Sequence, residues 1–321
     1  MIGGSRGVHG APRPEYREQV LMKKKRMSRR KRSHILYGYL MIAPLAVGLG
    51  VFYFYPFFKV FYDSFHVVGA FNKTSWAGLS NYITMFKDPV MWSTLWNTLR
   101  YVLVIVPFTL ALSVLIAALL NMNIRGRSVL RVIYFIPAIT MSSAISMIWR
   151  WIFNSDFGIL NFVLSKFGIP GVQWLSDPRT AWITITIVAV WMNVGYEMII
   201  LLAGMQGISR TYYESASLDG AGRFQQFFKI TLPLLTPTIF FVLITTLIST
   251  FQIFDVIYMM INSKSLAKEA SQSIVLYFYR NAFEYSKKGY ASAIAIFLFL
   301  IIMLITAFQM KMQNKWVNYD Q

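Results

Sequence analysis

The amino-acid sequence predicts an all-α polytopic membrane protein with six transmembrane helices. Of its 321 residues, 56% are hydrophobic and only 14% are charged, whereas about 25% of the residues of a soluble domain are charged. Six separate segments are apolar over the roughly 20 residues that a helix needs to cross a bilayer. Helices are expected because a helix satisfies its own backbone hydrogen bonds, which lipid cannot do for it.

The first element in order is a basic tail at 1–34, which we expect to be disordered and cytoplasmic. It holds 11 of the 31 Lys and Arg residues, with the dense run KKKRMSRRKR at 23–32. A basic run can bind nucleic acid. This one directly precedes an apolar segment, which favours attraction to anionic lipid and retention in the cytoplasm. The expected partner of the tail is therefore the lipid bilayer and no nucleic acid.

A six-span domain over 35–315 follows the tail, and 316–321 form the C-terminus. The expected spans lie at about 37–61, 98–120, 129–152, 181–206, 234–261 and 289–311. The second is the clearest, because the run from Tyr101 to Leu120 contains no charged residue. The third and fourth contain more Ser, Thr and Asn, which indicates that they face other helices rather than lipid.

The positive-inside rule gives the orientation of these spans. The basic tail decides it, and both termini are then expected in the cytoplasm, together with the loops at 121–131 and 207–232. Five basic residues of the last outer loop run against this orientation: Lys264, Lys268, Arg280, Lys287 and Lys288.

The sequence offers no catalytic or metal-binding constellation. It contains no cysteine, which excludes disulfides and thiolate metal sites. The three histidines, His9, His34 and His66, are widely spaced and indicate no metal cluster. There is no Gly-x-x-x-x-Gly-Lys-Ser/Thr phosphate loop, so the chain cannot itself be an ATP-hydrolysing motor. We expect no catalytic residue, no metal and no cofactor in it.

Between the fourth and fifth spans, the segment YYESASLDGAGRFQQFFKITLPLLTP at 212–237 predicts two short polar helices. Thr211 can cap the first, and Glu214, three residues later, can reach back to the cap. Gly220 allows the break, because glycine adopts a positive φ without a clash. Pro233 closes the second helix before the fifth span.

The second of these helices places Phe224, Phe227 and Phe228 on one face. An amphipathic linker resting on the lipid surface would also carry an apolar face. Because the polar face here is not rich in Lys, a projection that fits a partner's groove is favoured. The phenylalanines then either anchor the projection in the partner or pack back on the fourth and fifth spans.

This segment resembles the EAA loop of the permease subunits of bacterial binding-protein-dependent ABC importers. Six residues fall at the family spacing: Glu214, Ala216, Gly220, Ile230, Leu232 and Pro233. Ser215 departs from the motif, with one small residue in place of another. The form YYESASLDGAG is similar to the carbohydrate branch, as is the entry segment FYFYPFFKVFYDSF at 52–65. The resemblance covers about 35–315, with the EAA loop at 207–233.

The resemblance implies the permease subunit of an ATP-driven sugar or oligosaccharide importer in the bacterial inner membrane. Two permease subunits, here with a second, homologous chain, would form the pathway by alternating access. Two separate ATPase subunits would hold ATP and Mg, and an extracytoplasmic solute-binding protein would deliver the sugar. The residues implied to couple the permease to the ATPases are Glu214, Ser215, Ala216, Asp219, Gly220, Ile230, Leu232 and Pro233.

Polar side chains within the fourth and fifth spans are candidates for the substrate pathway. Ionisable residues inside a span are costly and usually functional. Asn193 and Glu197 share a helical face beside Tyr196, and Gln252 and Asp255 are three residues apart. Amides, carboxylates and aromatic rings are the groups that hold sugars, although polar contacts between helices are the alternative for both sets.

The basic side chains at the ends of the second and third spans are expected to extend toward the outer interface. They are Arg100 and Arg150.

Three other functions stay open. The chain could be an ABC permease for amino acids or phosphate esters, or a proton-coupled transporter with Glu197 or Asp255 as the proton relay. A membrane-embedded enzyme is the third, although no two acidic residues lie close in sequence at either membrane face. Which sugar is carried, and whether it is neutral or acidic, is not encoded in a form that the sequence reveals.

Overall fold

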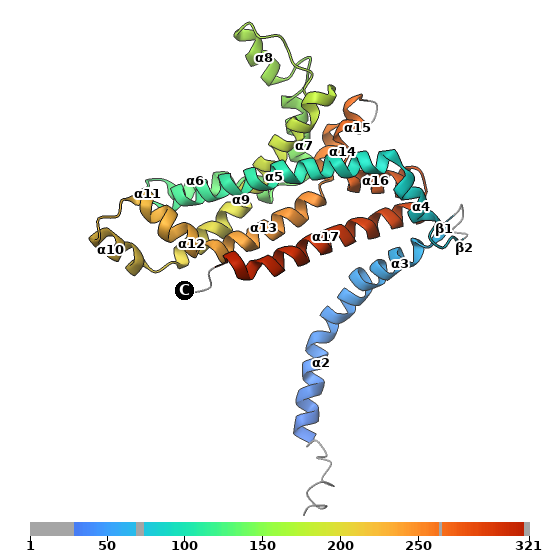
Figure 1. The fold of residues 1–321 in the computed structure, drawn as a ribbon, viewed down its shortest axis with the longest axis horizontal. Helices are drawn as coiled ribbons and strands as arrows, with labels where there is room; N and C mark the ends of the chain where they lie inside the picture. Colours follow the sequence, from blue (N-terminus) through green and yellow to red (C-terminus); the bar gives the residue numbers. More distant parts are fainter. Residues whose placement is uncertain (1–28, 69–73, 263–264, 318–321) are drawn as a thin grey trace, which may run out of the picture. The chain divides into compact units, whose positions relative to one another are not determined.

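A computed structural model of the protein describes residues 29–68, 74–262 and 265–317, which are mostly helical (Figure 1). Most of the expected basic tail, and the last residues of the expected C-terminus, lie outside the described residues. The chain divides into two compact units, residues 1–59 and 60–321.

The first unit is a long apolar helical run. It consists of α2 (Arg29–Leu49), the π-turn η1 (Gly50–Phe54) and the start of α3 (Tyr55–Asp63). The run Leu36–Asp63 is long and apolar enough to cross a membrane, and none of its most apolar window is buried within the chain. Its side chains therefore need lipid or another protein as their environment.

The second unit begins with a small hairpin and a short helix. Strands β1 (His66–Val68) and β2 (Thr74–Trp76) pair antiparallel, with His66 opposite Trp76. The side chain of Asn81 in α4 (Ser80–Lys87) donates to the backbone carbonyls of Ser64 and His66, at 2.9 and 3.0 Å. This amide fixes α4 against the strand.

Four helices form the body of the second unit: α5 (Pro89–Asn121), α9 (Pro178–Gly207), α13 (Thr236–Phe251) and α17 (Lys288–Trp316). Two of them begin in the same way, because Asp88 and Asp177 cap α5 and α9 through their side chains and a proline follows each. Helix α5 packs along α9 more extensively than any other described pair.

Two further stretches are helix pairs with a sharp bend. Helices α6 (Arg127–Ile139) and α7 (Ser142–Ile152) meet at 99°, and the segment Arg223–Leu234 meets α13 at 65°. By length and composition, the described residues contain four membrane-crossing helices, or six if each bent pair counts as one. The expected third span is thus a bent pair, and the expected fifth ends in a separate helix, α14 (Asp255–Met260).

Short elements connect these helices at both ends of the body. At one end lie α10 (Arg210–Leu218), α11 (Arg223–Gln226), the π-turn η3 (Phe227–Thr231) and α12 (Leu232–Leu234), while α4 and the hairpin lie at the other (Figure 1). We call residues 208–235 the α10–α12 segment. The remaining short elements are α8 (Ile159–Lys166), α15 (Ala267–Ser271), α16 (Ile274–Tyr279) and the π-turn η4 (Arg280–Glu284).

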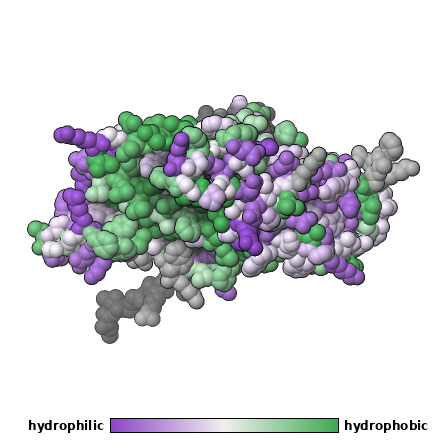
Figure 2. Space-filling model, turned by 90° about the horizontal axis from the view of Figure 1, so that it is seen from above, coloured by the Kyte–Doolittle hydropathy of each residue, from purple (hydrophilic) through white to green (hydrophobic). Residues whose placement is uncertain are grey.

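Three clusters of buried apolar side chains hold the second unit together. They centre on Tyr101 and Ile185, on Met85 and Phe251, and on Met198 and Leu235. The last cluster lies beside the α10–α12 segment. On the face shown in Figure 2, a hydrophobic area is flanked by hydrophilic residues toward both ends of the long helices, as expected for a bilayer-crossing body.

Candidate functional site

The first helix of the α10–α12 segment is capped by Ser209. Its hydroxyl accepts from the amide of Thr211 at 3.4 Å. The expected cap at Thr211 is therefore wrong, because α10 begins at Arg210 and Thr211 already lies in its first turn. Glu214 is exposed on the same helix.

Gly220 ends this helix with a positive φ of 78°, as its glycine predicts. The amide of Gly220 donates to the carbonyl of Ser217, and that of Ala221 to the carbonyl of Ala216, at 3.1 and 2.9 Å. This pair of bonds is a Schellman closure, which satisfies carbonyls that the end of a helix leaves free. The break is thus a defined turn, and Asp219 lies exposed within it.

Side-chain hydrogen bonds tie the two arms of the segment together. The hydroxyls of Tyr213 and Thr231 are 2.9 Å apart. The amide nitrogen of Gln226 donates to the hydroxyl of Ser217 and to the carbonyl of Ala221, at 2.9 and 3.0 Å. Because these bonds cross the turn, the segment can transmit force as one body.

The three phenylalanines do not share one environment. Phe227 is partly buried and packs against the cluster that contains Met205 and Leu235. Phe224 is 79% exposed, with its ring 4.8 Å from that of Phe228. Phe227 therefore packs the segment against the long helices, and Phe224 and Phe228 form an exposed aromatic surface.

The motif residues divide in the same way. Glu214, Ser215, Asp219 and Gly220 are exposed and Ala216 is half-buried. Three motif residues at the root are partly buried: Ile230, Leu232 and Pro233. The first half of the motif is thus available to a partner, and the second half joins the long helices.

The structure separates the substrate candidates of α9. Glu197 is 5% exposed, and its carboxyl oxygen accepts from the hydroxyl of Thr246 on α13 at 2.5 Å. Asn193 is half-buried and donates to the carbonyl of Ala189 in its own helix at 2.8 Å. Tyr196 is 56% exposed. No hydrogen bond among the described residues joins these three side chains.

The candidates of the fifth span do not share a helical face. Helix α13 ends before Gln252, which is its C-cap residue, and Asp255 is the first residue of α14. The expectation of one continuous helix is therefore wrong here, because residues 252–254 leave the helical path. Both side chains are exposed at this break.

Sequence analysis missed that α5 anchors the segment 267–274. The side chain of Asn97 donates to the carbonyls of Glu269 and Gln272, at 2.8 and 3.3 Å. The hydroxyl of Tyr101 donates to the carbonyl of Ser271, and that of Thr98 accepts from the amide of Ile274. A local signal existed, since these polar residues are grouped at the start of an otherwise apolar span.

Arg100 belongs to the same anchor. Its guanidinium donates to the carbonyl of Ala270 at 3.0 Å and lies 4.3 Å from the ring centre of Trp182. A carbonyl and an aromatic face thus satisfy the cation within the chain, and Ala270 belongs to the expected last outer loop. Arg150 makes a longer contact, 3.5 Å, with the carbonyl of Met259.

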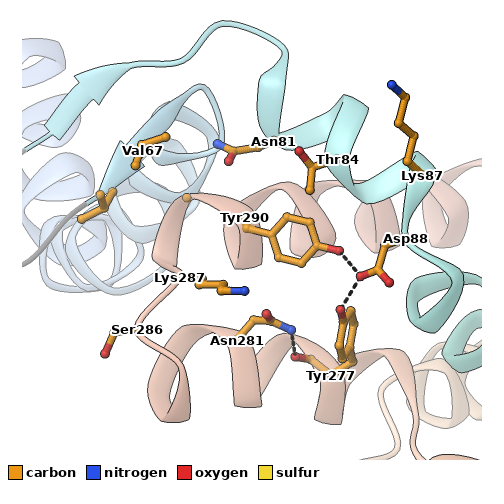
Figure 3. Close-up of a pocket in the computed structure, with 12 residues that line it drawn as sticks. Val67, Asn81, Thr84, Lys87, Asp88, Tyr277, Asn281, Ser286, Lys287 and Tyr290 are labelled. Carbon is orange, nitrogen blue, oxygen red and sulfur yellow. Dashed lines mark hydrogen bonds between the residues drawn. The ribbon is translucent and has the colours of Figure 1, made fainter.

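A cavity of about 570 Å³ lies beside Asp88, lined by residues of β1, α4, α16 and α17 (Figure 3). Helix α4, β1 and the start of α17 are at the opposite end of the body from the α10–α12 segment (Figure 1). In the cavity, Tyr290 donates to a carboxylate oxygen of Asp88 at 2.6 Å, Tyr277 donates to the same oxygen, and the amide of Val90 donates to the other at 2.9 Å. Burial opposes ionisation of Asp88, but these hydrogen bonds outweigh it and hold the pKa of the carboxyl below its ordinary value.

Among the described residues, no group of three His, Cys, Asp or Glu side chains could hold a metal ion. The described residues instead offer three features: the α10–α12 segment with its tied arms, a buried polar contact between α9 and α13, and the cavity beside Asp88.

Comparison with known proteins gives one family. Residues 109–319 match the model of the binding-protein-dependent transport system inner membrane component. The chain is 37% identical to the probable ABC transporter permease protein YesP of Bacillus subtilis, over 91% of this chain and 95% of that protein. It is 33% identical to the sulfoquinovosyl glycerol transport system permease protein SmoG of Agrobacterium fabrum, over 85% of this chain and 88% of that protein.

Similarity extends to a further relative and to a solved structure. The trehalose/maltose transport system permease protein MalF of Thermococcus litoralis is 33% identical, over 85% of this chain and 92% of that protein. A chain from the crystal structure of a bacterial ABC transporter involved in the import of the acidic polysaccharide alginate aligns with a TM-score of 0.80. At 24% identity, over 90% of this chain and 98% of that one, this likeness concerns the fold.

Proposed function

The chain belongs to the family of binding-protein-dependent transport system inner membrane components, and from this premise we propose that it is the permease subunit of an ATP-driven importer of sugars or oligosaccharides. Curated relatives carry the names of such solutes, including trehalose/maltose, arabinooligosaccharides and lactose. Similarity across most of the chain supports the same solute class here.

The α10–α12 segment is the coupling element of this importer. The observation that carries this assignment is its construction: an exposed motif half on a projection whose arms are tied by Tyr213–Thr231 and by Gln226. Each of two ATPase subunits would receive one such projection, from this chain and from a second, homologous permease. Glu214, Ser215, Ala216, Asp219 and Gly220 would contact the ATPase.

The root of the segment would pass the motion of the ATPases to the membrane helices. Ile230, Leu232 and Pro233 lead directly into α13, and Phe227 packs beside α9. ATP and Mg remain with the ATPases, and this chain binds no cofactor of its own. The sugar pathway then opens to the two sides of the membrane in turn.

The proposed topology has six spans, with each bent helix pair as one span. Both termini and the α10–α12 segment lie on the cytoplasmic side of a bacterial inner membrane. Support comes from the described loop at 122–126 and the end of α17, which lie at the same end of the body as α10–α12 (Figure 1). The opposite end would meet an extracytoplasmic solute-binding protein.

The half-buried Asn193 and the exposed Tyr196, Gln252 and Asp255 are the remaining candidates for sugar contact. We assign Glu197 a different role, because its side chain is buried against α13 and not open to solute.

Reconstitution tests the proposal. The chain is purified with its co-purifying subunits, inserted into vesicles and supplied with ATP, a solute-binding protein and labelled oligosaccharides. We expect an ATPase and a second permease in the preparation and sugar uptake that depends on ATP. Uptake that a protonophore abolishes in ATP-loaded vesicles, without any co-purifying ATPase, would support a proton-coupled transporter instead.

A further inference from the structure

The cavity beside Asp88 has two basic residues on its rim. Lys87 is the last residue of α4, and Lys287 directly precedes α17. Both line the cavity and both are exposed. Figure 3 shows the Lys287 side chain between Tyr290 and Asn281. Within the part of the chain that the structure describes, neither lysine forms an ion pair with an acidic side chain.

Asp88 lines the same cavity but forms no ion pair with either lysine. Both of its carboxylate oxygens already accept hydrogen bonds, from Tyr277, Tyr290 and the amide of Val90. Burial and the neighbouring carboxylate raise the pKa of the Tyr277 hydroxyl, so that hydroxyl keeps its proton and remains a donor. These neutral donors orient the Asp88 carboxylate and leave its charge in place. Two lysines face this one carboxylate, so the cavity keeps an excess of positive charge for an outside anionic group.

The rim that carries Lys287 is held in a fixed conformation. The amide of Lys287 donates to the carbonyl of Asn281 at 2.7 Å, and Ser286 adopts a positive φ of 56°. At Gly289, a Cβ atom would lie 1.9 Å from the carbonyl oxygen of His66. Only glycine permits the start of α17 to lie this close to β1, and this close packing holds the turn before it. A fixed rim lowers the entropy cost of binding.

We propose that this cavity is a socket for an acidic side chain of the solute-binding protein, which Lys87 and Lys287 hold by charge. The inference rests on the proposed function, because that function places this end of the body outside the cell. The cavity has room for an amino-acid side chain, and its lining combines apolar residues such as Val67 and Val68 with polar ones such as Thr84.

A carbodiimide crosslink tests the contact directly. The reagent joins a lysine amine to a carboxylate that touches it, with loss of water, and adds no spacer. In the reconstituted complex with its binding protein, we expect crosslinked peptides that contain Lys87 or Lys287. The double variant Lys87→Gln, Lys287→Gln should lack them. Crosslinks confined to other lysines, such as Lys166 on α8, would overturn the proposal.

Charge reversal tests the energetic role of the socket. In the double variant Lys87→Glu, Lys287→Glu, the concentration of binding protein that half-stimulates the ATPase should rise about tenfold, because facing like charges repel. The maximal rate at saturation should stay unchanged, and the salt dependence of stimulation should become weaker. Both lysines are exposed, so the variant should assemble with its partners, which gel filtration checks.

Lys166→Glu is the control for each single reversal, since it makes the same charge change as Lys87→Glu or Lys287→Glu alone, but on α8. An equal shift in this control would mean a general field effect and would refute the socket. The same holds if reversal leaves half-stimulation unchanged but removes a dependence of the ATPase on anionic phospholipid. If the binding protein fails to stimulate even the unmodified complex, the proposed function itself fails, and the socket fails with it.

Discussion

The hydroxyl of Thr246 donates to the buried carboxyl group of Glu197 and so joins α13 to α9 inside the membrane body. Helix α9 ends at Gly207 and α13 begins at Thr236, so this bond connects the two helices that enclose the α10–α12 segment. The other carboxyl oxygen of Glu197 has no hydrogen-bond partner among the described residues. A bond in this place can make α9 and α13 move together when the α10–α12 segment between them moves.

Removing either partner of this bond should weaken coupling. Thr246→Val leaves Glu197 buried without its donor, which costs about 1–3 kcal/mol. We expect a lower melting temperature of the purified complex and fewer sugars imported per ATP hydrolysed. Glu197→Gln retains an acceptor for Thr246 and should be much milder.

Thr245→Val is the control for Thr246→Val. The hydroxyl of Thr245 bonds only to carbonyls of its own helix, those of Phe241 and Val242. The substitution is of the same kind and lies one residue away, but it breaks no bond between helices. If Thr245→Val and Thr246→Val lower the transport ratio equally, the bond to Glu197 has no role in coupling.

The turn at Gly220 should be sensitive to substitution through its backbone alone. No atom lies within 4 Å of a Cβ built there, so Gly220→Ala meets no clash and should cost only about 1 kcal/mol for its positive φ. Gly220→Pro cannot adopt this φ at all. We expect Gly220→Ala to reduce uptake several-fold and Gly220→Pro to abolish it while ATP hydrolysis continues.

A second glycine provides the comparison for this substitution. Gly168 also has a positive φ, of 70°, but it follows α8 and lies outside the α10–α12 segment. Gly168→Pro should disturb its own loop and leave uptake coupled to hydrolysis. Normal uptake by Gly220→Pro, measured in the same vesicles, would refute the coupling role of the turn.

The sequence predicted those parts of the structure that depend on local physics. The apolar runs placed the long helices, because hydrophobic length decides them, and Gly220 marked a turn that the backbone confirms. The helix break at Gln252 was missed, since the apolar residues continue through it and only tertiary packing draws the chain out of the helix.

The contacts that the sequence could not predict join residues far apart along the chain. Asp88 and Tyr277 are 189 positions apart, and Glu197 and Thr246 are 49 apart. Composition suggested a role for Glu197, but without a neighbouring helix its partner could not be identified. The acceptor of Arg100, the carbonyl of Ala270, is likewise brought close only by the fold.

The anchor between α5 and the segment 267–274 should be measurable by hydrogen exchange. Asn97→Ala removes two bonds to backbone carbonyls, those of Glu269 and Gln272. At about 1 kcal/mol for each lost bond, amide exchange in 267–274 should accelerate roughly tenfold or more. The α10–α12 segment, at the other end of the body, serves as the internal control and should exchange at its original rate. Equal acceleration in both segments would indicate general destabilisation rather than a local anchor.

The hydrogen bonds to Asp88 should give the protein an acid-sensitive contribution to stability. Its pKa is lower in the folded state than the ordinary value, so this contribution is complete above the ordinary Asp pKa of about 4 and is lost as the pH falls toward the folded value. Tyr277→Phe removes one donor and should reduce the loss of melting temperature between pH 6 and pH 3.

Asp177→Asn is the matched control, because Asp177 also caps a helix that begins with proline, but its carboxylate has no tyrosine donor among the described residues. If Tyr277→Phe keeps the full acid sensitivity of the unmodified protein, the tyrosines do not stabilise the ionised form of Asp88.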